Sequence, residues 1–245
     1  MVKLMKEEQN VRTFNGSTFK EPVAMFIVTF ILSLLFYKFI VVFVPENYAR
    51  IAAVGSHLPM LIIPWLWIRF RMRSNMEKLV LWKWTEKSIK PLLLIAAWLL
   101  PLQIIGNLDV IGNPLPIWYQ HGAGTILLEL FFQGIFVGFA EEMLMRPAIH
   151  RTLLVKSGGG FYLFRKVYIS FPLIITSSLF AVLHMVNFMN QPIGLTVFQA
   201  LYAFIIGTIL GYYYERTRNY IGTALLHNAI DVIHVVVVLL VAWML

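Results

Sequence analysis

Apolar residues occur along this chain in long, nearly uninterrupted runs. Most of these runs have about the ~20 residues that an α-helix needs to cross the hydrocarbon core of a bilayer. They predict seven membrane-spanning helices, at about residues 22–44, 49–70, 91–112, 122–149, 167–189, 193–215 and 220–245. We therefore predict an all-α fold, a polytopic transmembrane helix bundle of about seven spans.

Polar and basic stretches lie between and before the apolar runs. Residues 1–21 are polar, and we interpret them as a cytoplasmic amino-terminal segment. The run at 22–44 is longer than the apolar core of a signal peptide, about 7 to 15 residues, so we expect it to be retained as the first span. Residues 79–89 are basic and contain two tryptophans, which would suit an eighth helix lying flat at the membrane interface. No repeat or long linker divides residues 22–245, which we expect to form a single domain.

The composition agrees with a membrane protein. Hydrophobic residues make up 59% of the 245 residues and charged residues only 13%, and the mean hydropathy is +0.75. The absence of cysteine excludes disulfides, thiolate catalysis and cysteine-ligated metals. We attribute the net charge of +8 to orientation in the membrane and to contact with anionic lipid, and we expect no nucleic-acid partner.

The basic residues also predict the topology. Nearly all of the 20 lysines and arginines precede the first predicted span or lie between spans two and three, four and five, or six and seven. The opposite loops at 112–123 and 189–194 carry none. By the positive-inside rule, the amino terminus is then cytoplasmic, and an odd number of spans places the carboxyl terminus outside. We expect a multi-pass protein of the cell membrane.

Six of the ionisable residues inside the apolar runs fall into three short clusters. A charge or a histidine in hydrocarbon costs several kcal/mol or more, so each is a functional-site hypothesis by default. The first cluster comprises Glu141, Glu142 and Arg146. Glu142 and Arg146 are one helical turn apart and can pair, which would leave Glu141 free to act as a general base. The alternative is that this cluster is merely the interfacial end of the fourth span.

The other two clusters contain histidines. Phe180 precedes His184 by one turn, so its ring can pack on the imidazole and limit its rotamers. His227, Asp231 and His234 form one stripe on the last predicted span, which must face protein or water. Hydrogen-bonded residues at an interface or a seam between helices are the alternatives for these two clusters.

If Glu141 and His184 belong to one site, the fourth span must be long enough to bring them together. His184 lies about 25 Å along a straight helix that begins at residue 167, well into the membrane. Glu141 can meet it only if the fourth helix continues beyond the glutamates. We therefore predict one long helix from about Gly124 to Lys156, with a kink at Pro147 because proline lacks a backbone donor.

These motifs carry a resemblance to a known family. Glu-Glu-x-x-x-Arg at 141–146, Phe-x-x-x-His at 180–184 and His-x-x-x-Asp at 227–231 resemble, in that order, the CAAX protease and bacteriocin-processing (CPBP) family, also called Abi or type II CAAX endopeptidases. The resemblance covers about residues 120–235, the protease-like core. The family's small-residue helix is matched by Gly207-x-x-x-Gly211, a spacing that allows close helix packing.

Two positions depart from the family pattern. Residues 216–219 replace an Arg-Thr-Gly-Ser type turn, and Asp231 stands where many members have asparagine. An ionised carboxylate accepts hydrogen bonds but cannot donate one to an oxyanion, so this departure bears directly on the chemistry.

The resemblance implies hydrolysis of a peptide bond at or within the membrane. Glu141 and His184 would activate a water, and His227 with Asp231 would polarise the carbonyl or bind its oxyanion. Glu142, Arg146 and Phe180 would support them. A zinc ion held by Glu141, His184 and His227 is the alternative mechanism, and we do not commit to a metal cofactor.

Two main function classes remain, which differ in whether the protein catalyses a reaction at this site. The first is an intramembrane endopeptidase that acts on a peptide or a membrane-protein substrate, with a peptide-export system as a candidate partner. The second is a non-catalytic adaptor or bacteriocin-immunity protein of the same fold, binding a sensor kinase or a toxin. A transporter is a third option, but it would call for broken helices in matched halves, which the sequence lacks. The filled polar positions favour the enzyme.

Overall fold

A computed structural model describes residues 17–45, 49–71, 90, 93–95, 97, 101, 122–156, 159–164, 167–189 and 191–244. The expected interfacial helix at 79–89 lies outside these residues, as does nearly all of the expected third span at 91–112. The first 16 residues of the expected cytoplasmic segment also lie outside them.

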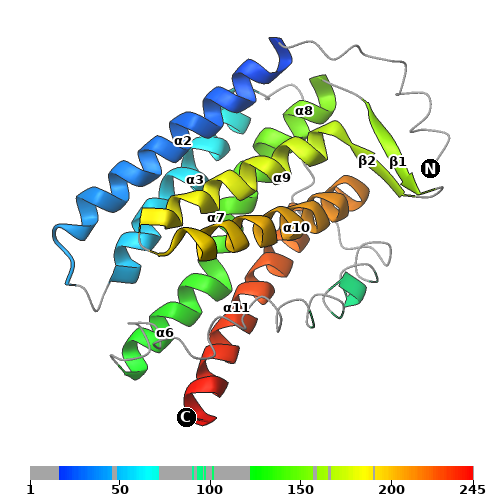
Figure 1. Cartoon of the computed structure of the whole chain (residues 1–245). Helices are drawn as coiled ribbons and strands as arrows, with labels where there is room; N and C mark the ends of the chain where they lie inside the picture. Colours follow the sequence, from blue (N-terminus) through cyan, green and yellow to red (C-terminus); the bar gives the residue numbers. More distant parts are fainter. Residues whose placement is uncertain are drawn as a thin grey trace.

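Helices dominate the described part of the chain (Figure 1). The α-helices are α2 (Ser17–Val41), α3 (Ala49–Arg71), α6 (Ala123–Phe131), α7 (Gly138–Met143), α8 (Arg151–Lys156), α9 (Phe171–His184), α10 (Ile193–Thr217) and α11 (Tyr220–Met244). Two π-helical segments, η4 (Phe132–Val137) and η5 (Leu144–His150), connect α6, α7 and α8, and the 3-10 helix η6 (Met185–Met189) follows α9. Six helices of this part are long and apolar enough to cross a membrane. The predicted polytopic helix bundle is confirmed, and the protein is a multi-pass membrane protein.

The longest span confirms the prediction for the fourth apolar run. Residues Ala123–Lys156 form one continuous helical stretch of 34 residues that passes through Glu141 and Glu142. At Pro147, where we expected a kink, the helix widens into the π-helical segment η5. A wider turn is a common response of a helix to a residue that cannot donate to the hydrogen-bond ladder.

The start of the fifth span differs from the prediction. Val167–Ser170 form a strand, β2, which pairs antiparallel with β1 (Gly160–Phe164), and α9 begins only at Phe171. Residues 167–169 are β-branched or aromatic, which favours a strand. Ser170 then caps α9 by accepting a hydrogen bond from the Leu173 N–H at 3.0 Å. An apolar run alone did not reveal this change of structure.

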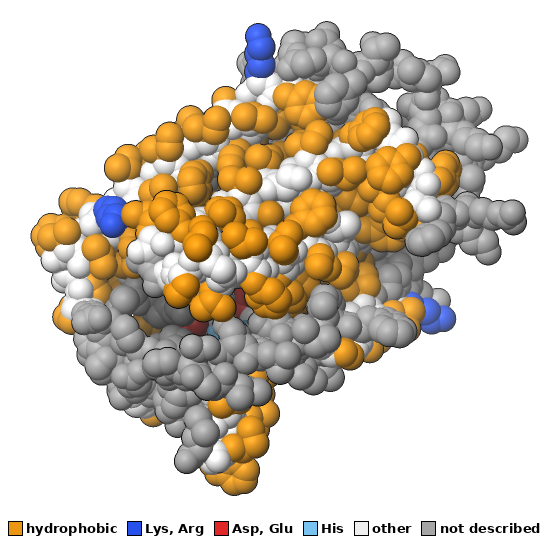
Figure 2. All heavy atoms as spheres, in the orientation of Figure 1, with side chains coloured by type: hydrophobic (Ala, Val, Ile, Leu, Met, Phe, Trp, Pro, Cys, Tyr) orange, Lys and Arg blue, Asp and Glu red, His pale blue; other side chains and the backbone are white. Residues whose placement is uncertain are grey.

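The centre of the bundle is the middle of the long span. α7 contacts α3 on one side and α11 on the other, while α9 lies along α10 and α2 along α3. Every residue of η5 is buried, including Arg146 and His150. The segment that carries the glutamates is therefore enclosed by protein, whereas the face shown in Figure 2 is covered mostly by hydrophobic side chains, as contact with lipid requires.

Glycines permit the closest helix contacts. A Cβ on Gly207 would lie 3.1 Å from the Phe180 ring, and one on Gly211 would lie 2.5 Å from the Leu173 side chain. The Gly-x-x-x-Gly spacing, which allows close helix packing, thus lies where α10 meets α9. Gly138 plays the same part between α7 and α11, because a Cβ there would lie 2.6 Å from the backbone oxygen of Ala224.

We predict that Gly138→Ala destabilises the protein by about 1–3 kcal/mol, because α11 must move away from α7 to admit the methyl group. The measurement is the midpoint of thermal unfolding in detergent. Gly124→Ala in the same span is the matched control, because a Cβ there has no neighbour within 4 Å among the described residues. Equal midpoints for the two variants would contradict this account of the helix contact.

Candidate active site

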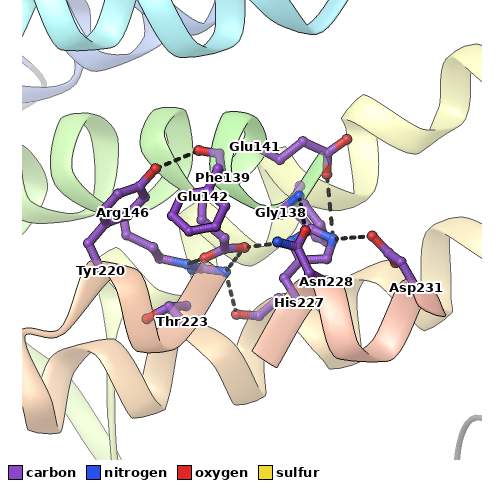
Figure 3. Close-up of polar contacts among 12 residues, drawn as sticks. Gly138, Phe139, Glu141, Glu142, Arg146, Tyr220, Thr223, His227, Asn228 and Asp231 are labelled. Carbon is purple, nitrogen blue, oxygen red and sulfur yellow. Dashed lines mark hydrogen bonds and ion pairs between the residues drawn. The ribbon is translucent and has the colours of Figure 1, made fainter. Parts of the chain in front are cut away.

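Residues from five elements meet around the centre of the long span. α7 provides Glu141 and Glu142, η5 provides Arg146, and α11 provides His227 and Asp231 (Figure 3). α9 provides Phe180, and α3 provides a histidine that the sequence analysis did not single out. Glu142 and Arg146 are fully buried, and Glu141 and His227 are nearly so.

Glu142 and Arg146 form the predicted ion pair. The Arg146 Nε donates to Glu142 Oε2 at 2.6 Å, and its Nη2 donates to the backbone oxygen of Gly207 at 3.1 Å. A Cβ on Gly211 would lie 2.7 Å from Arg146 Nη1. The two glycines of α10 therefore serve the site as well as the packing, because they make room for the guanidinium and expose a carbonyl to it.

His227 lies among three carboxylates. Its Nδ1 is 3.2 Å from Glu142 Oε1, and its Nε2 is 3.5 Å from Asp231 Oδ2 and 3.8 Å from Glu141 Oε2. A carboxylate only accepts, so the Nδ1–H donates to Glu142. Glu142 thus joins the arginine to the histidine, and it fixes the direction in which Nε2 points (Figure 3).

Phe180 connects the α9 motif to the α11 motif. Its ring centroid is 4.8 Å from that of His184, as the sequence predicted, and 5.5 Å from that of His227. The Nδ1–H of His184 donates to the backbone oxygen of Phe180 at 2.9 Å. Because a carbonyl oxygen cannot donate, Nδ1 carries a proton, so in the neutral tautomer the lone pair lies on Nε2. No direct hydrogen bond joins His184 to Glu141 in the described part of the chain.

Two carboxylate oxygens in this group are buried and have no hydrogen bond to any described residue. They are Glu141 Oε2 and Asp231 Oδ2, and both face His227 Nε2 at the distances given above. Buried polar atoms normally have a partner, so these atoms mark a place for a polar ligand or a water. Figure 2 shows a hollow in the surface with acidic and histidine side chains visible inside it.

Two residues of the site were missed by the sequence analysis. His57 of α3 lies 3.2 Å from Glu141 Oε1 through its Nε2. Asn228 accepts a hydrogen bond from the Gly138 N–H at 2.7 Å and donates to the Ile135 oxygen at 3.1 Å. His57 could have been found, because it is a histidine inside an apolar run like the others. Nothing in the sequence indicated a role for Asn228, because an asparagine next to His227 only adds to the polarity of the same helical turn.

A second buried polar group lies further along the same span. His150 Nε2 is 2.8 Å from Glu215 Oε1, and its Nδ1 is 3.2 Å from Thr176 Oγ1. Ser170 also donates to Glu215. This group ties the end of η5 to the start of α9 and the end of α10. All its members have hydrogen-bond partners, which is typical of a structural clamp.

The zinc alternative requires three ligands around one point. Among the described residues, no group of three or more histidine, cysteine, aspartate or glutamate side chains is placed to hold a metal ion.

Comparison with known proteins bears on the same part of the chain. Residues 123–233 match the model of the family described as type II CAAX prenyl endopeptidase Rce1-like. This range begins with α6 and ends within α11, so it contains all three motifs. No curated protein and no solved structure matched the chain.

The matched region is thus similar to a type II CAAX prenyl endopeptidase domain. The resemblance found in the motifs is thereby confirmed over nearly the range expected. α2 and α3, which pack against this domain, lie outside it.

The buried pair yields a stability prediction. Glu142→Gln should destabilise the protein by roughly 3–5 kcal/mol, because Arg146 is left charged and uncompensated in the interior. The midpoint of thermal unfolding in detergent measures this effect. Glu142→Leu combined with Arg146→Met should recover part of the loss, since neither charge is then buried. A double variant less stable than Glu142→Gln alone would count against the pair as the source of the loss.

Proposed function

We propose that this protein is an intramembrane endopeptidase that hydrolyses a peptide bond in a peptide or a membrane-protein segment. The observation that supports this most is the placement of Glu141 Oε2, a buried carboxylate oxygen without a hydrogen bond to any described residue, 3.8 Å from His227 Nε2. The base that delivers a water and the group that stabilises the oxyanion must both lie next to the reacting carbonyl, and these two side chains are next to each other.

The proposed reaction uses Glu141 as the general base. Its free oxygen takes a proton from a water as the water oxygen bonds to the carbonyl carbon of the substrate. The Nε2 lone pair of His184 accepts the second hydrogen of that water and helps to orient it. When the carbon–nitrogen bond breaks, the proton held by Glu141 passes to the leaving amine. One water and one amide thus give a carboxylic acid and an amine.

His227 is the proposed oxyanion stabiliser. Its Nδ1–H is committed to Glu142, so Nε2 is the nitrogen that faces the reacting group. Nε2 can donate to an oxyanion only when it carries a proton, and the Asp231 carboxylate 3.5 Å away favours that form. In this proposal Asp231 acts through His227. It does not itself have to donate a hydrogen bond to the oxyanion, which an ionised carboxylate cannot do.

The site also has the surroundings that hydrolysis in a membrane needs. The reacting groups are nearly buried, so their electrostatic effects are not screened by bulk water. Acidic and histidine side chains are visible inside the hollow in Figure 2, and we propose that a substrate segment and water reach the site through it. We propose that the substrate is a peptide or a membrane-protein segment that enters this hollow from the lipid or from the cytoplasmic side.

We predict that Glu141→Gln and His184→Ala each lower kcat for peptide cleavage by about 10²–10⁴-fold, because each removes a group that handles the proton of the water. The measurement uses the detergent-purified protein and a library of fluorogenic peptides, prenylated and unprenylated. Glu21→Gln is the matched control, because it makes the same change at a half-exposed carboxylate paired with Lys156.

The outcomes distinguish the enzyme from a binding protein. Loss of cleavage in both site variants with full activity in the control supports the protease. A cellular phenotype that depends on the protein but survives Glu141→Gln would contradict it and favour an adaptor.

Removal of metal gives an independent prediction. Cleavage should be unchanged in 1,10-phenanthroline, because the described residues offer no three-ligand metal site. The same fluorogenic assay is run with and without the chelator. Activity that disappears with chelator and returns with zinc would overturn the glutamate-dependent mechanism.

A further inference from the structure

Glu141 has a partner from outside the protease domain. His57 lies on α3, whereas the matched domain covers residues 123–233. Its Nε2 is 3.2 Å from Glu141 Oε1, and only 16% of the His57 side chain is exposed. The contact therefore joins a helix that the family match does not include to the proposed base of the reaction.

The imidazole of His57 is held in one orientation. Its Nδ1 is 2.8 Å from the backbone oxygen of Ala53 and 3.1 Å from Ser56 Oγ. The Ser56 hydroxyl in turn donates to the same Ala53 oxygen at 2.7 Å. On its other side the ring meets Phe132 edge to face, with centroids 5.1 Å apart. Contacts on both sides of the ring fix the direction of Nε2 toward Glu141.

The hydrogen bonds determine where a proton must lie. The Ala53 oxygen can only accept, so Nδ1 of His57 carries a hydrogen. The contact between His57 Nε2 and Glu141 Oε1 is a hydrogen bond only if one further proton lies between them. Oε1 of Glu141 is then engaged in the hydrogen bond with His57, whereas Oε2 has no hydrogen bond to a described residue.

The charge balance of the site favours the same arrangement. Three carboxylates, those of Glu141, Glu142 and Asp231, lie around His227, and one permanent cation, Arg146, pairs with Glu142. Uncompensated buried charge is costly, so further protons are expected within the group. His227 contacts all three carboxylates, and His57 is the other histidine hydrogen-bonded to one of them in the described part of the chain.

We propose that His57 is a positioning residue for Glu141, holding Oε1 by a hydrogen bond so that Oε2 faces the water and His227. The proposal rests on the proposed function, because it assigns Glu141 as the base. It extends the reacting unit beyond the family domain to α3, and it gives the packing of α3 against α7 a role in catalysis as well as in stability.

The kinetic test compares two substitutions of His57. Phenylalanine fills the space of the ring but cannot donate, so His57→Phe should lower kcat about 10–100-fold with KM unchanged, as expected for a misplaced reacting group. Glutamine carries an amide nitrogen near the position of Nε2, so His57→Gln should restore most of kcat. A purely structural role predicts instead that the two variants lose activity in proportion to their loss of stability.

A matched control and a second readout accompany the kinetics. Thr29→Val alters a buried side chain of α2 whose hydroxyl has no hydrogen-bond partner among the described residues, and it should leave kcat unchanged. The second readout is a double-mutant cycle on the thermal unfolding midpoint, with His57→Phe, Glu141→Met and both together. A direct contact predicts that the double variant loses less than the sum of the single losses.

The two readouts separate this inference from the proposed function. Non-additive midpoints in a protein that cleaves no peptide would support the contact and contradict the protease. Cleavage by the wild type, full kcat in His57→Phe and additive midpoints would overturn the role of His57 while leaving the protease intact. Equal loss of kcat in His57→Gln and His57→Phe would also overturn it, since a donor then makes no difference.

Discussion

The buried ion pair between Glu142 and Arg146 is the interaction on which the rest of the site depends. Arg146 reaches the backbone of α10 at Gly207, and Glu142 holds His227 of α11. One pair in the long span thus fixes the positions of two neighbouring helices. Because a charge left alone in this interior would be costly, the pair also restricts how far these helices can move apart. The orientation of His227, and through it that of Asp231, follows from this constraint.

The long span combines polar groups with close packing along one helix. Glu142, Arg146 and His150 follow one another along α7 and η5, and each contacts α10 or α11. The π-helical segment around Pro147 lies in the middle of this series. π-helical turns are frequent at functional sites, where a shifted turn changes the direction of the following side chains. The glycines of α10 complete the arrangement, since a larger residue at Gly211 would collide with the Arg146 guanidinium.

Much of this could be predicted from the sequence because a bilayer imposes simple rules. Run length predicted the spans, the rarity of buried charge singled out Glu141 and His227, and helical spacing predicted the pairing of Glu142 with Arg146. The strand at Val167–Ser170 was missed, because its apolar residues suit either a strand or a helix. The contact of His57 with Glu141 was also missed, since 84 residues separate them and no spacing rule reports which helices become neighbours.

The central claim is that Glu141 and His227 both lie next to the reacting carbonyl, Glu141 as the base and His227 as the oxyanion stabiliser. An experimental structure with a bound phosphinate peptide, a mimic of the tetrahedral intermediate, tests it most directly. The account predicts one phosphinate oxygen within hydrogen-bond distance of Glu141 Oε2 and the other within that distance of His227 Nε2. A phosphinate bound in the hollow but in contact with neither residue would contradict the account.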